Sequence, residues 1–266
     1  MGIRFACAGL SCLLLFNSCG GGGNATTPAS SDSVKIIYLH HSTGATVWAG
    51  GVDSYFTAYN GAHGTSYEIT ERAYPDTPYD WANYPYDYWN LWVNPGGPAN
   101  DSNPKVHSLA KLCSDYDVIV FKHCFPVSGI LADTGAPLVS SSEKRLENYK
   151  LQYAALKTAL NAHPTKQFIV WTGAALLESE SDADQGTRAR AFSEWVKNTW
   201  DVPGDNIFVW DFFELETEGG NFLKAAYAAG DSHPSAAFSA TVAPYIGKRI
   251  VDVVEGRGDT GSLTGK

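Results

Sequence analysis

Residues 117–122 are DVIVFK, a short apolar run that is rich in β-branched side chains. Runs of the same character are KIIYL at 35–39, QFIVWT at 167–172 and NIFVWDF at 206–212, with a weaker one at 66–70. A strand that is apolar along its whole length, without alternation, is typical of a sheet that is covered on both faces. These five runs therefore predict the strands of one buried sheet.

Amphipathic helical patterns lie between and after these runs. Apolar side chains recur every three or four residues over 143–162 and again over 187–200. A third pattern occupies 235–254, with Pro234 marking its start. Strands that alternate with helices are typical of a mainly parallel sheet with helices on both faces. The sequence therefore predicts an α/β fold, a three-layer α/β/α sandwich.

The 266 residues include 44% hydrophobic and 13% aromatic side chains, and the formal net charge is −9. We find no internal repeat, so one domain is predicted over 34–255, followed by a frayed tail at 256–266. The acidic balance argues against binding to duplex nucleic acid, which depends on Lys and Arg facing phosphates. It also argues against electrostatic docking on anionic lipid. A neutral or weakly charged ligand fits this charge better.

The first residues have the character of an export signal. Arg4 precedes an apolar run through Phe16 that is too short to span a bilayer, and the run ends at Ser18-Cys19. This ending resembles the bacterial lipoprotein processing site, in which the Cys is lipidated and becomes the new N-terminus. An ordinary secretory signal is the alternative. We expect residues 1–18 to be removed and the protein to be exported, with its membrane contact made through a lipid on Cys19.

Small polar residues follow Cys19 and predict that residues 19–33 form a flexible tether. Two cysteines, Cys113 and Cys124, lie in the predicted domain. An oxidising compartment would permit a disulfide between them, but the sequence does not fix the distance between their Cα atoms. Their pairing is therefore left open.

Polar side chains follow the predicted strands at their carboxyl ends. The segment HHS occupies 40–42, HC occupies 123–124, and DSH at 231–233 directly precedes the last helical pattern. Ligands bind outside the carboxyl ends of the strands in sheets of this type. Imidazole is often neutral near pH 7, so histidines gathered there suit proton transfer or metal binding. The sequence therefore predicts a functional site at this edge.

The segments LHHSTG (39–44), FKHCFP (121–126) and DSHPS (231–235) resemble the SGNH/GDSL hydrolase superfamily, in the branch with HHS in place of GDS in the first block. The resemblance covers most of residues 34–255. It implies a flavodoxin-like fold and ester hydrolysis or deacetylation without a cofactor. It also implies that Ser42 is the nucleophile and His233 the general base, because a serine hydroxyl needs an imidazole to take its proton.

An acid must orient that imidazole and stabilise its charged form. Asp231 is the nearest candidate, although the family has two residues between the Asp and the His and this chain has one. A backbone carbonyl or Asp211 is the alternative. The literal GDS at 230–232 lies at the wrong end of the chain, and Ser232 is adjacent to His233, so we favour Ser42 as the nucleophile.

The tetrahedral intermediate needs hydrogen-bond donors, and the backbone N–H of Ser42 is the first one expected. The family usually adds a Gly after the second strand and an Asn after the third. His123 or Cys124 stands where that Asn would lie, and Gly96 or Gly97 is the substitute available for the Gly. Free Cys is also a common small buried side chain. The further donors therefore remain open.

Residues 74–92 carry eight aromatic side chains and three prolines. This composition predicts a long ordered loop rather than a regular helix, lying on the side of the site. Flat rings there suit the faces of sugars, although such a loop can equally pack its aromatics as a small separate core. We take Trp81, together with His41, His123 and Cys124, as candidate substrate-binding residues. His41 is equally suited to holding its own turn.

The leading hypothesis is a serine esterase or deacetylase that acts on an acylated carbohydrate, for example an acetylated one, or on a related ester. It uses Ser42, His233 and Asp231 and needs no cofactor and no metal. A carbohydrate-binding module on a degenerate hydrolase scaffold is the alternative, because the family's oxyanion residues are missing. A metal-dependent hydrolase that uses the histidines is a third hypothesis, but the sequence has no HExxH or similar tight ligand spacing.

Overall fold

Five parallel strands form the centre of the fold. The structure is a computed structural model that describes residue 2 and residues 33–266. The strands are β1 (Val34–His40), β2 (Tyr67–Ala73), β3 (Val118–Phe121), β4 (Gln167–Trp171) and β5 (Ile207–Trp210). They form one sheet in the order β2-β1-β3-β4-β5, with every pairing parallel. This is the flavodoxin-like strand order, so the predicted fold class is confirmed.

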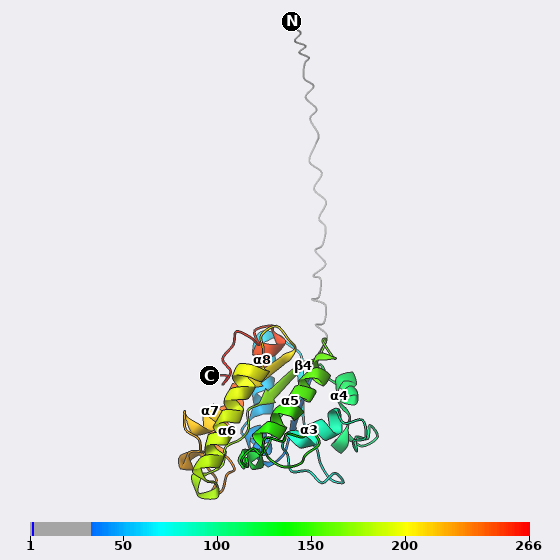
Figure 1. Ribbon diagram of the computed structural model, residues 1–266. Helices are drawn as coiled ribbons and strands as arrows, with labels where there is room; N and C mark the ends of the chain where they lie inside the picture. The colour runs from blue at the N-terminus through cyan, green and yellow to red at the C-terminus, as the bar shows by residue number, and fades with distance from the viewer. Residues whose placement is uncertain (1, 3–32) are drawn as a thin grey trace. The chain divides into compact units, whose positions relative to one another are not determined.

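Helices cover both faces of the sheet (Figure 1). One face carries α1 (Ser42–Ala49), α2 (Val52–His63), α7 (Phe212–Thr217) and α8 (Ala236–Val254). The other face carries α3 (Pro85–Trp92), α4 (Leu109–Asp115), α5 (Leu146–Asn161) and α6 (Ala183–Trp195). The helix α6 continues into a π-helical turn at Val196–Trp200. The result is the three-layer sandwich.

The strands contain long apolar runs because helices cover both faces of the sheet. In β1, Ile36 and Tyr38 join the core beneath α8, whereas Ile37 and Leu39 join the core beneath α5. All four side chains are fully buried or nearly so. Successive side chains of a strand point to opposite faces. Because neither face meets water along this part of the strand, these four consecutive positions are all apolar.

The segment 74–92, which was predicted to be one long loop, ends in a helix. Its last eight residues form α3, and Pro85 is the first residue of that helix. A proline is well tolerated there, since the first helical residue has no intrahelical acceptor for its N–H. The carboxylate of Asp87 accepts hydrogen bonds from the N–H groups of Ala82, Asn83 and Tyr84, which closes the turn in front of the helix.

The C-terminal residues 256–266 do not fray, which corrects the expectation for them. The carbonyl of Leu263 accepts a hydrogen bond from the N–H of Asp211 at 2.8 Å. The indole N–H of Trp210 donates to the carbonyl of Thr264 at 2.9 Å. Both bonds lie at the end of β5, an edge strand of the sheet, and the first pairs the backbone N–H of the residue that follows the strand.

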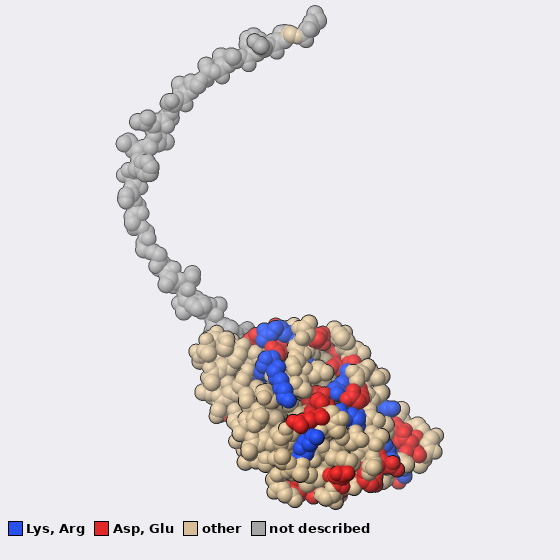
Figure 2. Space-filling model, turned by 90° about the vertical axis from the view of Figure 1, so that its left-hand side faces the viewer, with Lys and Arg blue, Asp and Glu red and all other residues tan. Residues whose placement is uncertain are grey.

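Charges of both signs are interspersed on the face shown in Figure 2. Within the described residues, no helix is long and apolar enough to cross a bilayer. The predicted signal, Cys19 and the tether as far as residue 32 lie outside the residues that the structure describes.

Candidate functional site

Ser42 begins α1 directly after the carboxyl end of β1, and it is exposed. The backbone is still extended at His41, and the carbonyl of His41 accepts hydrogen bonds from the N–H groups of Gly44 and Ala45. The N–H of Ser42 has no intrahelical acceptor, because it lies in the first turn. That N–H also stands at the positive end of the helix dipole. The local geometry thus presents a hydroxyl and a backbone donor together.

Cys124 lies beneath Ser42. Its Sγ atom is 3.1 Å from the Oγ of Ser42 and 2.8 Å from the Nζ of Lys122, and it also accepts from the backbone N–H of Thr43. Lys122 is fully buried at the end of β3. A Cβ atom at Gly44 would come within 2.9 Å of the Lys122 side chain, so this position leaves no room for a larger residue.

Lys122 and Cys124 each shift the pKa of the other. Burial alone raises the pKa of the Cys124 thiol, but the charge of Lys122 and the hydrogen bonds from Lys122, Ser42 and Thr43 outweigh it and bring the pKa below its ordinary value. Burial lowers the pKa of Lys122, and the thiolate and Glu216 only partly oppose this. The lowered pKa of Cys124 favours Sγ as the acceptor in its contact with the Ser42 hydroxyl.

His233 and Asp231 form a pair just before α8. The Nδ1 atom of His233 lies 3.0 Å from both carboxylate oxygens of Asp231, and the backbone N–H of His233 donates to the same carboxylate. These bonds lower the pKa of Asp231, the backbone one most. With Nδ1 donating to the carboxylate, Nε2 is left as the proton acceptor on the opposite side of the ring.

Residues 124 and 125 contact both halves of the site. Cys124 contacts Ser42, and the ring of Phe125 meets the ring of His233 edge-on, with centroids 4.8 Å apart. Because these two residues are adjacent in sequence, one short segment contacts both Ser42, near the start of the domain, and His233, near its end. Among the described residues, the hydrogen-bond partner of the Ser42 hydroxyl is Cys124 rather than His233.

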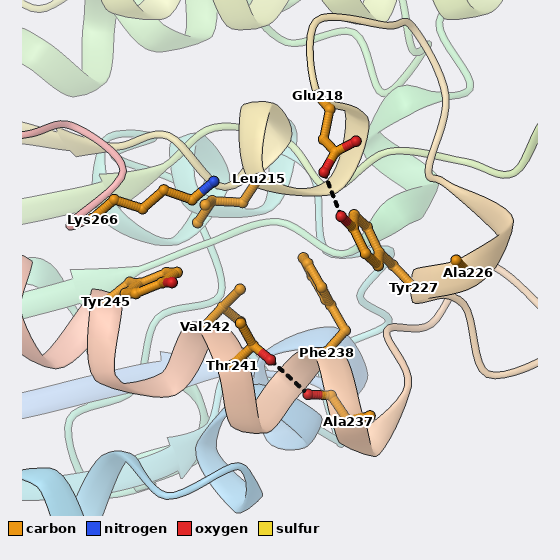
Figure 3. Close-up of a pocket in the computed structure, with 10 residues that line it drawn as sticks. All are labelled: Leu215, Glu218, Ala226, Tyr227, Ala237, Phe238, Thr241, Val242, Tyr245 and Lys266. Carbon is orange, nitrogen blue, oxygen red and sulfur yellow. Dashed lines mark hydrogen bonds between the residues drawn. The ribbon is translucent and has the colours of Figure 1, made fainter.

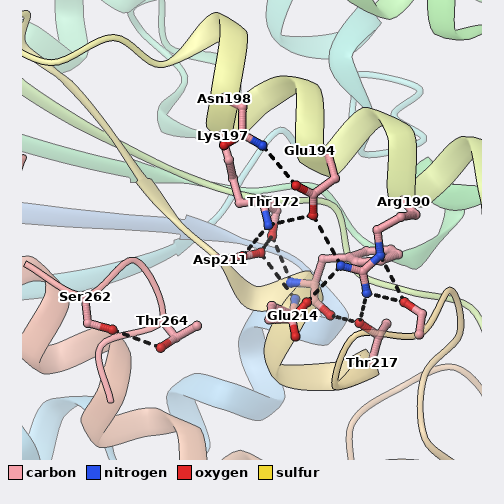
Figure 4. Close-up of polar contacts among 12 residues, drawn as sticks. Thr172, Arg190, Glu194, Lys197, Asn198, Asp211, Glu214, Thr217, Ser262 and Thr264 are labelled. Carbon is pink, nitrogen blue, oxygen red and sulfur yellow. Dashed lines mark hydrogen bonds and ion pairs between the residues drawn. The ribbon is translucent and has the colours of Figure 1, made fainter.

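Asp211, the alternative acid, is occupied elsewhere. Its carboxylate accepts from the Nζ of Lys197 at 2.8 Å and from the hydroxyl of Thr172 at 3.1 Å, and it caps α7 through the N–H of Glu214 (Figure 4). It therefore ties α7 and the π-helical turn after α6 to the ends of β4 and β5. Of the two carboxylates, Asp231 is the one that contacts His233.

Comparison with known proteins gives one finding about the fold. No family model matches the sequence, and neither does any curated protein. A solved structure, the crystal structure of the acetyl xylan esterase AlAXEase, is similar with a TM-score of 0.48 and 16% sequence identity. The match covers 79% of this chain and 96% of that chain. This likeness is confined to the course of the backbone.

The other histidines have separate partners. His40 lies 2.6 Å from Glu71, and His123 lies 2.7 Å from the hydroxyl of Tyr153. Burial lowers the pKa of each of these imidazoles to about 3, so both are neutral. Within residues 33–266, no group of three His, Cys, Asp or Glu side chains is placed to hold a metal ion.

Two residues that were predicted to bind the substrate are buried and contact protein side chains instead. His123 is fully buried among the side chains of α3 and α5, which argues against contact with a substrate. Cys124 is 2% exposed and contacts Ser42 instead. Both Cys124 and Cys113 are free thiols, which answers the question of their pairing.

Trp81 and His41 form a stacked pair beside Ser42, with ring centroids 3.6 Å apart. Trp81 is partly exposed, whereas His41 is mostly buried and its Nε2 atom contacts the carbonyl of Pro75. His41 therefore holds its turn, and Trp81 presents a ring face at the predicted rim.

Asn83 was not found from the sequence. It has a positive φ of 57°, is fully buried, and its Oδ1 atom accepts from the N–H of Cys124 at 2.6 Å. Asn tolerates this left-handed backbone better than most residues, which is the one signal that the sequence offered. The N–H groups of Gly96 and Gly97, considered as oxyanion donors, already donate within their own turn to Asn94.

A separate hollow of about 280 Å³ lies between α7 and the first half of α8 (Figure 3). Its walls are mainly apolar and include Leu215, Phe238 and Val242. None of the predicted catalytic residues lines it.

Proposed function

We propose that the protein is a serine esterase or deacetylase that acts on an acylated carbohydrate or a related ester. The observation that carries the proposal is the Asp231–His233 pair, whose ring packs on Phe125 while the neighbouring Cys124 contacts the exposed Ser42 hydroxyl. These contacts support a site in which a nucleophile, a base and an acid act together at the carboxyl edge of a parallel sheet, where such sites occur.

In this mechanism Nε2 of His233 takes the proton of the Ser42 hydroxyl as Oγ attacks the acyl carbon. The carboxylate of Asp231 holds the ring through Nδ1 and stabilises the imidazolium. The backbone N–H of Ser42 donates to the oxyanion. The imidazolium then protonates the leaving alcohol, and a water molecule, deprotonated by the same imidazole, releases the acid from Ser42.

The proposed setting is the cell envelope, with the protein exported and held by a lipid on Cys19. This proposal rests on the sequence of the first nineteen residues. The net charge of −9 supports a neutral ester as the substrate rather than an anionic polymer.

The test is hydrolysis of 4-nitrophenyl acetate by purified protein. Ser42→Ala should abolish turnover above the uncatalysed rate while the fold is retained. Ser232→Ala is the matched control, because the Ser232 hydroxyl is buried and hydrogen-bonds with Leu177 and Glu180 rather than facing a substrate. Full activity of Ser42→Ala, or covalent labelling of another residue by a serine-directed phosphonate, would contradict the proposal.

A second candidate is a carbohydrate-binding module on a hydrolase scaffold that has lost its activity. The observation that favours it is the hydrogen bond of Ser42 to Cys124 in place of one to His233. This candidate predicts glycan binding that does not change on Ser42→Ala, no turnover, and no phosphonate labelling.

A further inference from the structure

The aromatic segment 74–92 forms one wall of a cavity of about 420 Å³. We propose that this cavity is a binding subsite for a pyranose ring of a neutral glycan. The residues that carry the argument are Tyr79, Tyr86, Asp80, Asn90, Asn100 and Asn103. The proposal deepens the proposed function, on which it rests for the position of the ester, and it assigns the part of the site that would hold the sugar.

The lining has the chemistry of sugar recognition. Tyr79 and Tyr86 are partly exposed, and each packs its inner side on the hydrophobic core of the domain. A pyranose ring has an apolar face of C–H groups that stacks on an aromatic ring, and hydroxyls around its edge that need donors and acceptors. The side chains of Asn100 and Asn103 supply such groups beside the two rings.

Two of these amides are oriented with their donors free. The Oδ1 atom of Asn100 accepts from the backbone N–H of Ser102, and that of Asn103 accepts from the N–H of Lys105. Because each oxygen is held by a backbone N–H, each amide NH₂ group points away from that bond. Within the described part of the chain, neither NH₂ group has a protein acceptor within hydrogen-bond distance, so both are available to sugar hydroxyls.

The aromatic wall is held in place before any ligand binds. The hydroxyl of Tyr79 donates to the buried carboxylate of Asp87 at 3.0 Å and accepts from the amide of Asn90 at 3.3 Å. Burial raises the pKa of Asp87, while hydrogen bonds from Tyr79 and from three backbone N–H groups oppose that rise. A wall that is already ordered loses little side-chain entropy on binding.

The cavity adjoins a second hollow that contains Trp81. Asp80 and Tyr86 also line an adjoining hollow of about 350 Å³, to which Trp81 contributes. Trp81 stacks on His41, the residue that precedes Ser42. Trp81 thus links the second hollow to the segment that carries Ser42, and a glycan longer than one sugar could extend from Tyr86 to Trp81. The exposed carboxylate of Asp80 in both hollows disfavours a sugar with a carboxylate of its own.

The test is affinity gel electrophoresis in gels that contain unsubstituted xylan, glucomannan or hydroxyethyl cellulose, with the Ser42→Ala protein so that no turnover occurs. At least one of these neutral polysaccharides should retard migration. Tyr86→Ala in the same background should raise the dissociation constant about tenfold, because one stacking face is lost. Asn100→Ala, at an exposed position that leaves the core intact, should raise it several-fold.

Tyr245→Ala is the matched control, since this tyrosine lies on α8 and lines the separate hollow beside Lys266. It should bind as the parent protein does. Retardation by none of the three polysaccharides, or retardation that Tyr86→Ala and Asn100→Ala both leave unchanged, would overturn the subsite. Hydrolysis of 4-nitrophenyl acetate by the unmutated protein reports on the proposed function separately. Turnover without glycan binding refutes the subsite alone, and glycan binding without turnover refutes the esterase alone.

Discussion

The Nζ atom of Lys122 lies 2.8 Å from the Sγ atom of Cys124, and both side chains are buried beneath the exposed hydroxyl of Ser42. Burying an ammonium group is costly unless an opposite charge or a strong acceptor meets it. The Sγ atom of Cys124, whose pKa is lowered, supplies such an acceptor, and it also lies 3.1 Å from the Oγ atom of Ser42. The pair therefore links the stability of the sheet edge to the position of the candidate nucleophile.

Replacing Cys124 by alanine should lower both the stability of the protein and its catalytic rate. Cys124→Ala leaves the buried ammonium of Lys122 without the acceptor that Sγ provides, which should lower the free energy of unfolding by about 3 kcal/mol. The Ser42 hydroxyl also loses its partner, so we expect kcat to fall about tenfold with KM little changed. Urea unfolding and hydrolysis of 4-nitrophenyl acetate measure the two effects. Cys124→Ser, which retains an acceptor, should be affected less, and equal losses in both variants would contradict this role.

The ionisation of Cys124 should be visible in the ultraviolet. Since Lys122 and its neighbours hold the pKa of Cys124 below the ordinary value of a thiol, absorbance at 240 nm should rise at lower pH than for a free cysteine. Burial raises the pKa of Cys113 to about 11, so Cys113 should not contribute to that step. The difference between the native protein and Cys124→Ser isolates the signal. Lys122→Met should move the step to higher pH, and an unmoved step would disprove the coupling.

Much of the fold follows from the sequence because a sheet covered on both faces requires apolar strands. The runs at 35–39, 117–122 and 167–172 meet that requirement and are β1, β3 and β4. The sequence did not predict α1 because this helix lacks a stripe of apolar side chains. Its contact with the buried Lys122 is made by Gly44, which has no side chain to form such a pattern. The helix α3 was not predicted because its proline stands at the first position, where it does not break a helix.

The site was predictable in its place but not in its contacts. Parallel strands bring their carboxyl ends to one edge, so Ser42 and His233 could be assigned to that edge from the order of strands and helices. His123 is buried in the core, and Lys122 is buried beneath Ser42. Both placements depend on tertiary packing, and the second is unexpected because a lysine at the end of a strand usually faces solvent. The hydrogen bonds of Asn83 to Cys124 likewise join residues 41 positions apart.

Substitution of Asp231 should affect catalysis, whereas substitution of Asp211 should affect stability. Asp231→Asn keeps the shape of the side chain but removes the negative charge that holds the Nδ1–H of His233, so kcat should fall at least 100-fold while the fold is little affected. Asp211→Asn weakens the contact with Lys197 and should instead lower the urea midpoint, with the activity per folded molecule retained. The reverse pattern would identify Asp211 as the acid that serves His233.

Asp201 should make the protein less stable as the pH rises. Burial, together with the nearby carboxylates of Asp205 and Asp259, raises the pKa of Asp201 to about 7. An unfolded Asp titrates near pH 4, so between about pH 4 and 7 the folded state binds more protons than the unfolded state, and the free energy of unfolding falls as pH rises. Asp201→Asn removes this dependence of stability on pH.

The substitution should stabilise the protein by about 1–2 kcal/mol at pH 8 and by little at pH 4. The value at pH 8 allows for the partial exposure of the Asp201 side chain, which weakens the effect. Urea unfolding at both pH values measures the difference, with Glu68→Gln at an exposed position of β2 as the control for loss of a charge. A stabilisation of equal size at both pH values would show that the raised pKa of Asp201 is not its source.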